Sequence, residues 1–245
     1  MGWHGSLEIT PGRLVYTGQF GNTHIHNHAA VQITVATSGQ IAFIDHTGTQ
    51  LHAAAAIIPS GASHRIDTVG TAGAAGIVIY LEPASCAAIA ATARIVPSRR
   101  TLASDWIAAA SDLPSGPVAS VDGVLATLLG KPSNRPTVHP CVNAATALIP
   151  TLLADGPVRI TSIATAVGIS ADRLGRLFAR DLGVTFPTYL RWARIIRAVE
   201  VARAGATLTD AAHSAGFTDS AHLNRVCHEM FGIVPSQAAR TITCT

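Results

Sequence analysis

Histidines are the first residues in this sequence whose types and spacing suggest chemistry. Three of them alternate with other residues, and a glutamine follows at the same parity: His24, His26, His28 and Gln32. Successive side chains of a β-strand point to opposite faces, so these four are predicted to share one face of a strand. His64 comes later, directly after a tight-turn sequence. Imidazoles gathered in this way suit either metal coordination or the polar lining of a ligand pocket.

The elements that must position these histidines are predicted to be short strands. Residues 7 to about 83 alternate apolar, β-branched segments with Gly, Pro and Ser turns, which is typical of a sandwich or a barrel. The predicted strands are Leu14–Tyr16, His24–Val35, Gln40–Asp45, Ala54–Ile58, His64–Thr68 and Gly76–Glu82. His46 and His52 fall in turn-like stretches and are expected to be exposed.

The spacing of these residues resembles a known pair of motifs. Residues 26–39 read H-x-H-x3-Q-x6-G, and residues 59–64 read P-x-G-x2-H. Both resemble the motifs of the cupin superfamily, whose fold is a small β-barrel. The resemblance implies that the positions of metal ligands in metal-binding cupins are held here by His26, His28, Gln32 and His64. His24 lies on the same predicted face but outside the motif, and it is kept as a candidate.

The implied site offers three imidazoles and an amide oxygen, a donor set that suits Fe(II), Mn(II), Ni(II), Cu(II) or Zn(II). One departure from the family motif is Gln32, which stands where the family has Glu, so the site lacks an anionic ligand. The alternative is that the histidines line a cavity for a small molecule, or form cross-strand hydrogen bonds, without a metal ion. Both interpretations stay open at this stage.

The C-terminal half contains an internal repeat. Residues 160–184 are echoed by residues 208–233, and Thr161, Ala164 and Gly168 recur 48 positions later. Each copy reads as a short helix, a turn at Gly and a second helix that carries Arg. The predicted helices are Val142–Ala154, Thr161–Val167, Ala171–Leu182, a long helix between Pro187 and Gly205, Thr209–Ala215 and Asp219–Met230. This order is typical of two helix-turn-helix units joined by one linker helix.

Charged residues leave a basic face on the second helix of the first copy. Leu174, Leu177 and Phe178 recur at helical spacing and are predicted to face inward. The residues left facing outward are Ala171, Asp172, Arg173, Arg176 and Arg180. Arginines suit phosphate contacts and bidentate recognition of guanine, although a solvated face with an Asp172–Arg176 pair is the alternative. In the second copy the outward candidates are Ser220, His222, Asn224, Arg225 and His228.

Composition agrees with a two-part chain. Net charge is +3, and the basic excess lies in residues 138–245, which hold ten Lys/Arg and seven Asp/Glu against seven of each in residues 1–137. Alanine-rich helices are predicted at Ser85–Thr92 and Leu102–Ser111, and apolar residues at helical spacing predict a third at Val118–Leu129. A proline-rich stretch at residues 130–140 is the predicted boundary. The four cysteines lack metal-ligand spacing, and no signal peptide or long apolar run is evident, so a cytoplasmic protein is expected.

The repeat then identifies a family by resemblance. The first copy reads A-x3-G-x-S-x3-L-x-R-L-F-x4-G-V, the second A-x-x-A-G-F-x-D-S-x-H-L-x-R, and G-I-V-P-S follows. These motifs resemble those of the AraC/XylS transcriptional regulators over residues 140 to about 240. The resemblance implies operator binding, with Ala171, Arg173, Arg176, Ser220, His222 and Arg225 at base-reading positions. Cys227 departs from the family pattern, which usually has Phe there.

The sequence therefore predicts an α+β protein of two domains: an N-terminal cupin-like β-barrel and a C-terminal all-α domain with two helix-turn-helix motifs joined by a linker helix. The predicted divisions are a sensor domain at 1–100, a helical connector at 101–137 and a DNA-binding domain at 138–245. The expected function is a transcriptional regulator, with activation among its modes, that senses a small molecule or metal ion. The alternative is a cupin metalloenzyme, a dioxygenase or isomerase, recruited to DNA. Duplex DNA and the effector are the expected partners; RNA polymerase and a second copy of the chain are further candidates.

Overall fold

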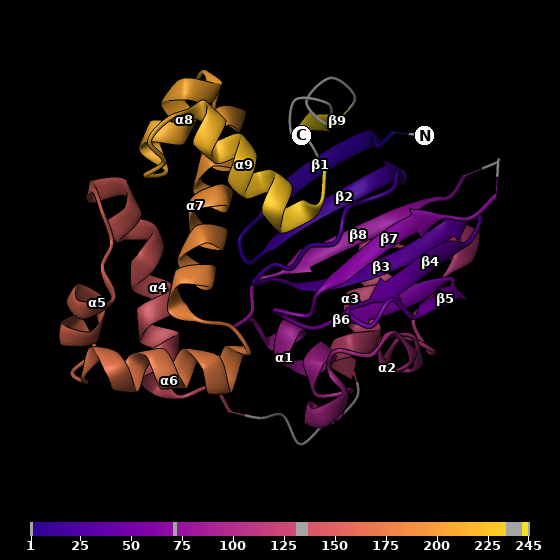
Figure 1. Ribbon diagram of the computed structural model, residues 1–245, viewed down its shortest axis with the longest axis horizontal. Coiled ribbons are helices and arrows are strands. Elements are labelled where there is room, and N and C mark those ends of the chain that lie inside the picture. Colours follow the sequence, from indigo (N-terminus) through magenta and orange to yellow (C-terminus); the bar gives the residue numbers. More distant parts are fainter. Residues whose placement is uncertain (1, 71–72, 131–136, 234–241, 245) are drawn as a thin grey trace. The chain divides into compact units, whose positions relative to one another are not determined.

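The computed structural model describes residues 2–70, 73–130, 137–233 and 242–244. Contacts between Cα atoms divide the chain into two compact units, one of residues 1–135 with 228–245 and one of residues 136–227. Figure 1 labels the strands of the first unit and the helices of both. Among the helices of the described residues, none combines the length and the apolarity needed to cross a membrane.

The first unit is built on two antiparallel sheets. The larger has the strand order β6-β3-β8-β2-β1-β9, and the smaller has the order β5-β4-β7. The bounds are β1 His4–Thr10, β2 Arg13–Gln19, β3 Val31–Ser38, β4 Ile41–Asp45, β5 Gln50–Ala53, β6 Ala55–Ile58, β7 His64–Thr68, β8 Ala75–Leu81 and β9 Ile242–Cys244. The last of these, β9, is the exception to the antiparallel pattern, because it pairs parallel to β1.

The two sheets do not close into the predicted barrel. The chain crosses from one sheet to the other after β3, β5, β6 and β7, and each sheet keeps its own strand order. The predicted strand His24–Val35 is wrong in its first half, because β3 begins at Val31. Residues 24–30 form one isolated bridge, His26 with His64, in place of a ladder that would join the sheets. The predicted strands at residues 40–45, 54–58 and 64–68 are confirmed within a residue, whereas β1 and β5 were not predicted.

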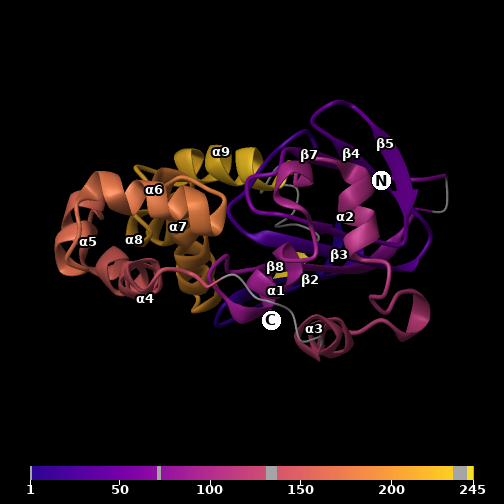
Figure 2. The ribbon, with the colours of Figure 1, turned by 90° about the horizontal axis from the view of Figure 1, so that it is seen from below.

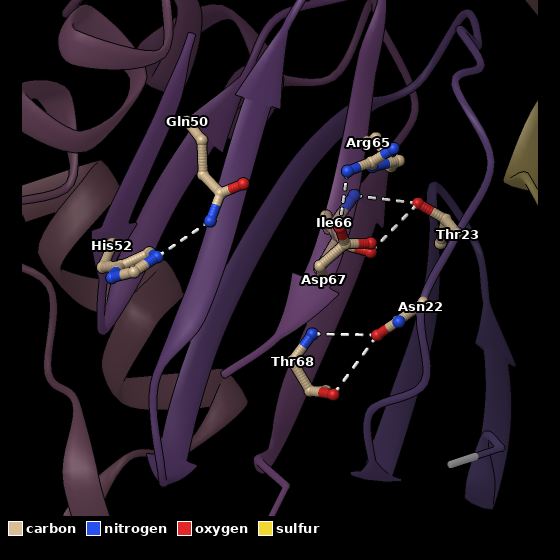
Figure 3. Close-up of polar contacts among 8 residues, drawn as sticks. All are labelled: Asn22, Thr23, Gln50, His52, Arg65, Ile66, Asp67 and Thr68. Carbon is tan, nitrogen blue, oxygen red and sulfur yellow. Dashed lines mark hydrogen bonds and ion pairs between the residues drawn. The ribbon is translucent and has the colours of Figure 1, made fainter. Parts of the chain in front are cut away.

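Backbone and side-chain hydrogen bonds hold the segment before β3 alongside β7. The backbone N–H of Thr23 donates to the Ile66 carbonyl over 2.9 Å. Ile66 N–H donates to Thr23 Oγ1 over 2.8 Å (Figure 3). Asn22 Oδ1 accepts from the N–H of Thr68 over 3.0 Å. On the other face of β7, Arg65 and Asp67 form an ion pair. These contacts bring the two sequence-distant histidine segments side by side.

Short helices lie around the sheets (Figure 2). They are α1 Cys86–Thr92, α2 Ala103–Ala109 and α3 Val121–Gly130, and α2 packs against β5 and β6. All three agree with predicted helices. His46 lies in an exposed turn as predicted, but His52 is in strand β5, although it is exposed.

The second unit is all helical over its described residues. The helices are α4 Pro140–Asp155, α5 Ile160–Ala166, α6 Ala171–Leu182, α7 Phe186–Arg203, α8 Leu208–Ser214 and α9 Ser220–Phe231, the last of which ends in the first unit. Phe178 and Trp192 are among the most deeply buried side chains. Pro150 lies inside α4, which starts two residues before the prediction.

Local capping explains why these helices begin where they do. Ser170 accepts from Arg173 N–H at the start of α6, as predicted, and Thr185 and Thr207 cap α7 and α8 in the same way. The predicted cap at Thr161 is wrong, because α5 begins at Ile160 and its N-cap, Arg159, makes no side-chain cap. Gly168 and Gly216 adopt φ values of 75° and 78°, a left-handed conformation that favours glycine and allows the tight turn after α5 and α8.

Candidate functional site

Helix α6 presents a basic, solvent-exposed face in the second unit. Leu174, Leu177 and Phe178 are buried on its inner side, as predicted from their spacing. Outside, Arg173, Arg176 and Arg180 are exposed, with Asp172 exposed beside them and Ala171 half-buried. The three arginines and His139 line one open surface hollow. The structure therefore brings the predicted α6 residues together on one accessible face.

Two of these arginines already have acidic neighbours. Arg176 donates to Asp172 one turn away, and Arg180 donates to Asp181, which also accepts from His139 N–H over 2.9 Å. Both partners of the Arg176–Asp172 pair are exposed, and such pairs contribute only a few tenths of a kcal/mol to about 1 kcal/mol. Arg176 can therefore exchange this carboxylate for a phosphate or a base edge at little cost. Arg173 has no carboxylate among the ion pairs of the described residues.

Helix α9 presents fewer exposed cations than α6. Asp219 Oδ1 accepts from His222 N–H over 2.6 Å and caps its start, and the His222 ring packs edge-on against Phe217. Arg225 is exposed, whereas Ser220, His222 and Asn224 are half-buried. His228, at the last turn, lies with its ring 5.3 Å from that of His24. Burial raises the pKa of the Cys227 thiol to about 12.

The predicted histidines meet in a buried cluster inside the first unit. His26, His28 and His64 each offer a ring nitrogen, and these atoms all lie within 4.8 Å of one another. His26 and His64 exchange two backbone hydrogen bonds of 2.9 Å each, which places their rings 4.1 Å apart. Gln32, on β3, reaches the same point with Oε1, 2.8 Å from His28 Nε2 and 3.2 Å from His64 Nε2.

Backbone carbonyls determine which nitrogen of each ring faces the cluster. The Nδ1 atoms of His26, His28 and His64 lie 2.8, 2.9 and 2.9 Å from the carbonyl oxygens of His24, Ala30 and Ala62. A carbonyl can only accept, so each Nδ1 carries the proton and each Nε2 keeps its lone pair. This is the arrangement by which proteins orient histidine ligands toward a metal ion.

Burial keeps these rings neutral. Desolvation lowers the pKa of His26 to about 3, with the nearby His28 acting in the same direction. Desolvation also lowers the pKa of His28, and that of His64 well below its ordinary value. Neutral imidazole is the form that binds metal ions. Gln32 donates its amide N–H to Thr34 Oγ1 over 2.9 Å, which turns its Oε1 toward the Nε2 atoms of His28 and His64.

Three features of this cluster were not visible in the sequence pattern. His24 is exposed, so its predicted place on the same face is wrong, although its carbonyl supports His26. Two aromatic side chains also reach the cluster: Tyr80 on β8 lies edge-on to His28, and Trp106 on α2 lies edge-on to His64. No spacing rule links positions so far apart in sequence.

Comparisons with known proteins find a domain match in the helical region. Residues 163–241 match the family model described as "Helix-turn-helix domain". The transcriptional activator RhrA of Rhizobium meliloti is 30% identical over 120 residues, which cover 48% of this chain and 38% of RhrA. The transcriptional activator RhaR of Pectobacterium atrosepticum is 35% identical over 81 residues, 33% of this chain and 28% of RhaR. The chain thus matches about a third of the length of these relatives.

A solved structure shares the fold over nearly the whole chain. ToxT from Vibrio cholerae O395 superimposes with a TM-score of 0.59 at 11% identity, covering 95% of this chain and 98% of that one. At this identity the likeness concerns the fold alone. The matched helix-turn-helix model agrees with the motifs of the repeat, and the relatives that match this chain in part are named as transcriptional activators. Residues 163–241 therefore resemble a helix-turn-helix domain.

Proposed function

We propose that this chain is a transcriptional regulator that binds specific duplex DNA through α6 and α9 and responds to a ligand at the cluster of His26, His28, His64 and Gln32. The observation that supports DNA binding is the exposed arginine face of α6 within a region that matches a helix-turn-helix model. Arg173 and Arg176 supply the bidentate donors that read guanine in the major groove. Arg180 supplies a phosphate contact at the same surface.

The length of the linker helix α7 supports binding of DNA by both helix-turn-helix units at once. Its 18 residues span about 27 Å at 1.5 Å per residue. A rigid helix of this length between the α5/α6 pair and the α8/α9 pair suits recognition helices that enter successive major grooves, about 34–36 Å apart. The first pair carries more exposed arginine, so α6 supplies the larger share of the binding energy.

DNA selection followed by titration tests this proposal. Sites selected from random duplexes give an operator, whose affinity is then measured at fixed salt for the wild type and for a variant with Arg173→Ala and Arg176→Ala. We expect a loss of about 30-fold or more, since each bidentate contact contributes about 1–3 kcal/mol. Arg203→Ala, at the exposed end of α7, is the matched control. Equal losses in both variants would assign the effect to general charge and not to base reading.

For the ligand we propose a divalent transition-metal ion. The observation that supports this proposal is that three buried, neutral imidazoles place their ligand nitrogens within 4.8 Å of one another, with Gln32 Oε1 in contact with two of the rings. A cation would satisfy all four acceptors at once. The set holds no carboxylate, so it favours Zn(II), Cu(II) or Ni(II) over Mn(II), which prefers oxygen anions, with Fe(II) between them.

Elemental analysis of the purified protein, followed by a Co(II) absorption titration, tests the metal site. The wild type should bind one equivalent, and the variant with His26→Ala and His64→Ala should bind none. His52→Ala is the control, because His52 is exposed on β5 away from the cluster. If the wild type binds no metal while an organic ligand still controls transcription, the metal proposal is wrong and the first unit responds to that ligand instead. ToxT, which shares the fold, has been crystallised with an unsaturated fatty acid bound. Contacts with RNA polymerase and a second copy of the chain also stay predictions.

A further inference from the structure

The last turn of helix α9, with the glycine that follows it, contacts residues of the histidine cluster and its surroundings. The residues from His228 onward group with the first unit, whereas α9 starts at Ser220 in the second. Gly232, directly after the helix, is buried, and its carbonyl accepts the N–H of His24 over 2.9 Å. The ring of Phe231 lies 5.2 Å from that of Tyr80 and 6.5 Å from that of His28.

A continuous chain of hydrogen bonds runs from the cluster to this turn. His26 Nδ1–H donates to the His24 carbonyl over 2.8 Å, and the His24 N–H donates to the Gly232 carbonyl. The same residue, His24, therefore orients the ring of a cluster histidine and holds the end of α9. Groups that orient a metal-bound histidine in this way are part of the binding site in energetic terms.

Packing at Gly232 leaves no room for a larger residue. A Cβ atom there would lie 2.6 Å from His26 Nδ1 and 2.6 Å from the His24 carbonyl oxygen, distances that real Cβ atoms do not show. Its φ of 64° also favours glycine. Only glycine therefore allows the end of α9 to lie this close to the ring of His26, which is one of the proposed metal ligands.

We propose that the turn His228–Gly232 couples the histidine cluster to the recognition helix α9, so that a bound metal ion and the seated turn stabilise each other. The inference rests on the metal site proposed above. The seated turn holds His26 in the tautomer and orientation that expose Nε2, and a bound ion holds His26 in the orientation that supports the turn. Helix α9 carries both this turn and the proposed DNA contacts Ser220 and Arg225. Metal binding at the cluster therefore affects a DNA-contacting helix directly, with no other helix or strand in between.

A pair of glycine variants tests this coupling by metal affinity. Gly232→Ala should weaken Co(II) binding about 10- to 100-fold, the usual effect of disturbing a group that orients a metal-bound histidine. Gly48→Ala is the control: Gly48 has a left-handed φ of 83° with nothing within 4 Å of the added Cβ, so it carries the backbone strain without the contact. We expect Gly48→Ala to bind Co(II) as the wild type does. Equal affinity of Gly232→Ala and the wild type would overturn the coupling.

Hydrogen exchange gives a second readout that needs no variant. Saturating Co(II) should slow amide exchange in the segment 228–232 of the wild type at least about 10-fold. Bound Co(II) should also change the affinity for a selected operator, and by linkage the operator should change the affinity for Co(II) by the same factor. Unchanged exchange in the metal-loaded wild type overturns the coupling even if Gly232→Ala fails to fold. A wild type that binds no Co(II) overturns the metal site and the coupling together, whereas metal binding without either effect overturns the coupling alone.

Discussion

Acidification should destabilise the first unit of the metal-free protein far more than the second. Three imidazoles are buried there as neutral groups, and desolvation lowers the pKa of His26 to about 3 and those of His28 and His64 below their ordinary values. In the unfolded chain a histidine titrates near 6.5. Between these limits the unfolded state binds more protons than the folded state, so stability falls as the pH falls through about 6.5 toward 3.

The magnitude follows from the same pKa values. Lowering the pH from 7 to 5 protonates a histidine of pKa about 6.5 in the unfolded chain and leaves one of pKa about 3 neutral, which costs about 2 kcal/mol of stability. The other two rings change the stability in the same direction, because desolvation also lowers the pKa of His28 and that of His64. The three titrations are coupled, and the first proton would gain Gln32 Oε1 as an acceptor, so we expect a total loss of about 2 kcal/mol or more. This is a large fraction of the stability of a typical domain.

Hydrogen exchange measured by mass spectrometry separates the two units. With a chelator present, and after correction for the intrinsic exchange rate, the opening free energy of β3 peptides should fall by this amount between pH 7 and pH 5. Peptides of α7 provide the internal control, because the second unit holds none of the three histidines. His26→Gln should reduce the change by about 2 kcal/mol, since it removes one titrating ring.

If the opening free energy of the β3 peptides changes by less than about 0.5 kcal/mol between pH 7 and pH 5, the reasoning is refuted. Such a result would mean that the three rings are already solvated or protonated at pH 7. An equal loss in α7 would point to a general acid effect. Saturation with Zn(II) should deepen the dependence on pH, since protons then compete with the ion for the same nitrogens.

Three further predictions concern other sites. Arg176→Ala should weaken operator binding by about 1–3 kcal/mol at fixed salt and relax specificity at one base pair, as measured by titration against single-base variants of the operator. An unchanged affinity would show that Arg176 does not contact a base. Arg94→Ala should lower the free energy of unfolding of the first unit by about 2–4 kcal/mol in urea, because Arg94 pairs with Asp112 and donates to the carbonyls of Ala109 and Thr127; a loss below about 1 kcal/mol would show that these bonds exchange freely with water. A thiol reagent at pH 8 should label exposed Cys86 well before Cys227, whose pKa is raised by burial, and equal rates would place Cys227 in solvent.

Much of the helical unit could be predicted from the sequence, because its signals are local. Apolar residues at helical spacing placed α6 at the bounds observed, and Ser170 capped it as expected. The glycines at 168 and 216 marked both turns through their need for positive φ. The exceptions were also local: Pro150 was accommodated inside α4, and Thr161 lies within α5 and does not cap it.

The sheet unit was harder, because pairing between strands depends on residues far apart in the chain. Period-two spacing suggested one long strand from His24, yet residues 24–30 form a single bridge and leave the two sheets unclosed. The alternating spacing correctly predicted that the side chains of His26 and His28 point the same way. It wrongly included His24, because His24 is not held by strand pairing.

The sequence alone thus determined the helices, the Ser170 cap of α6 and the arginine-bearing face, since each depends on neighbours within a turn or two of the same helix. It also determined the identity of the cluster residues His26, His28, Gln32 and His64. Only the tertiary structure decided that three carbonyls turn the Nε2 atoms toward one point, and that Gly232 closes against His26. Those features arise where segments separated by up to about 200 residues meet, and no local pattern encodes a contact of that range.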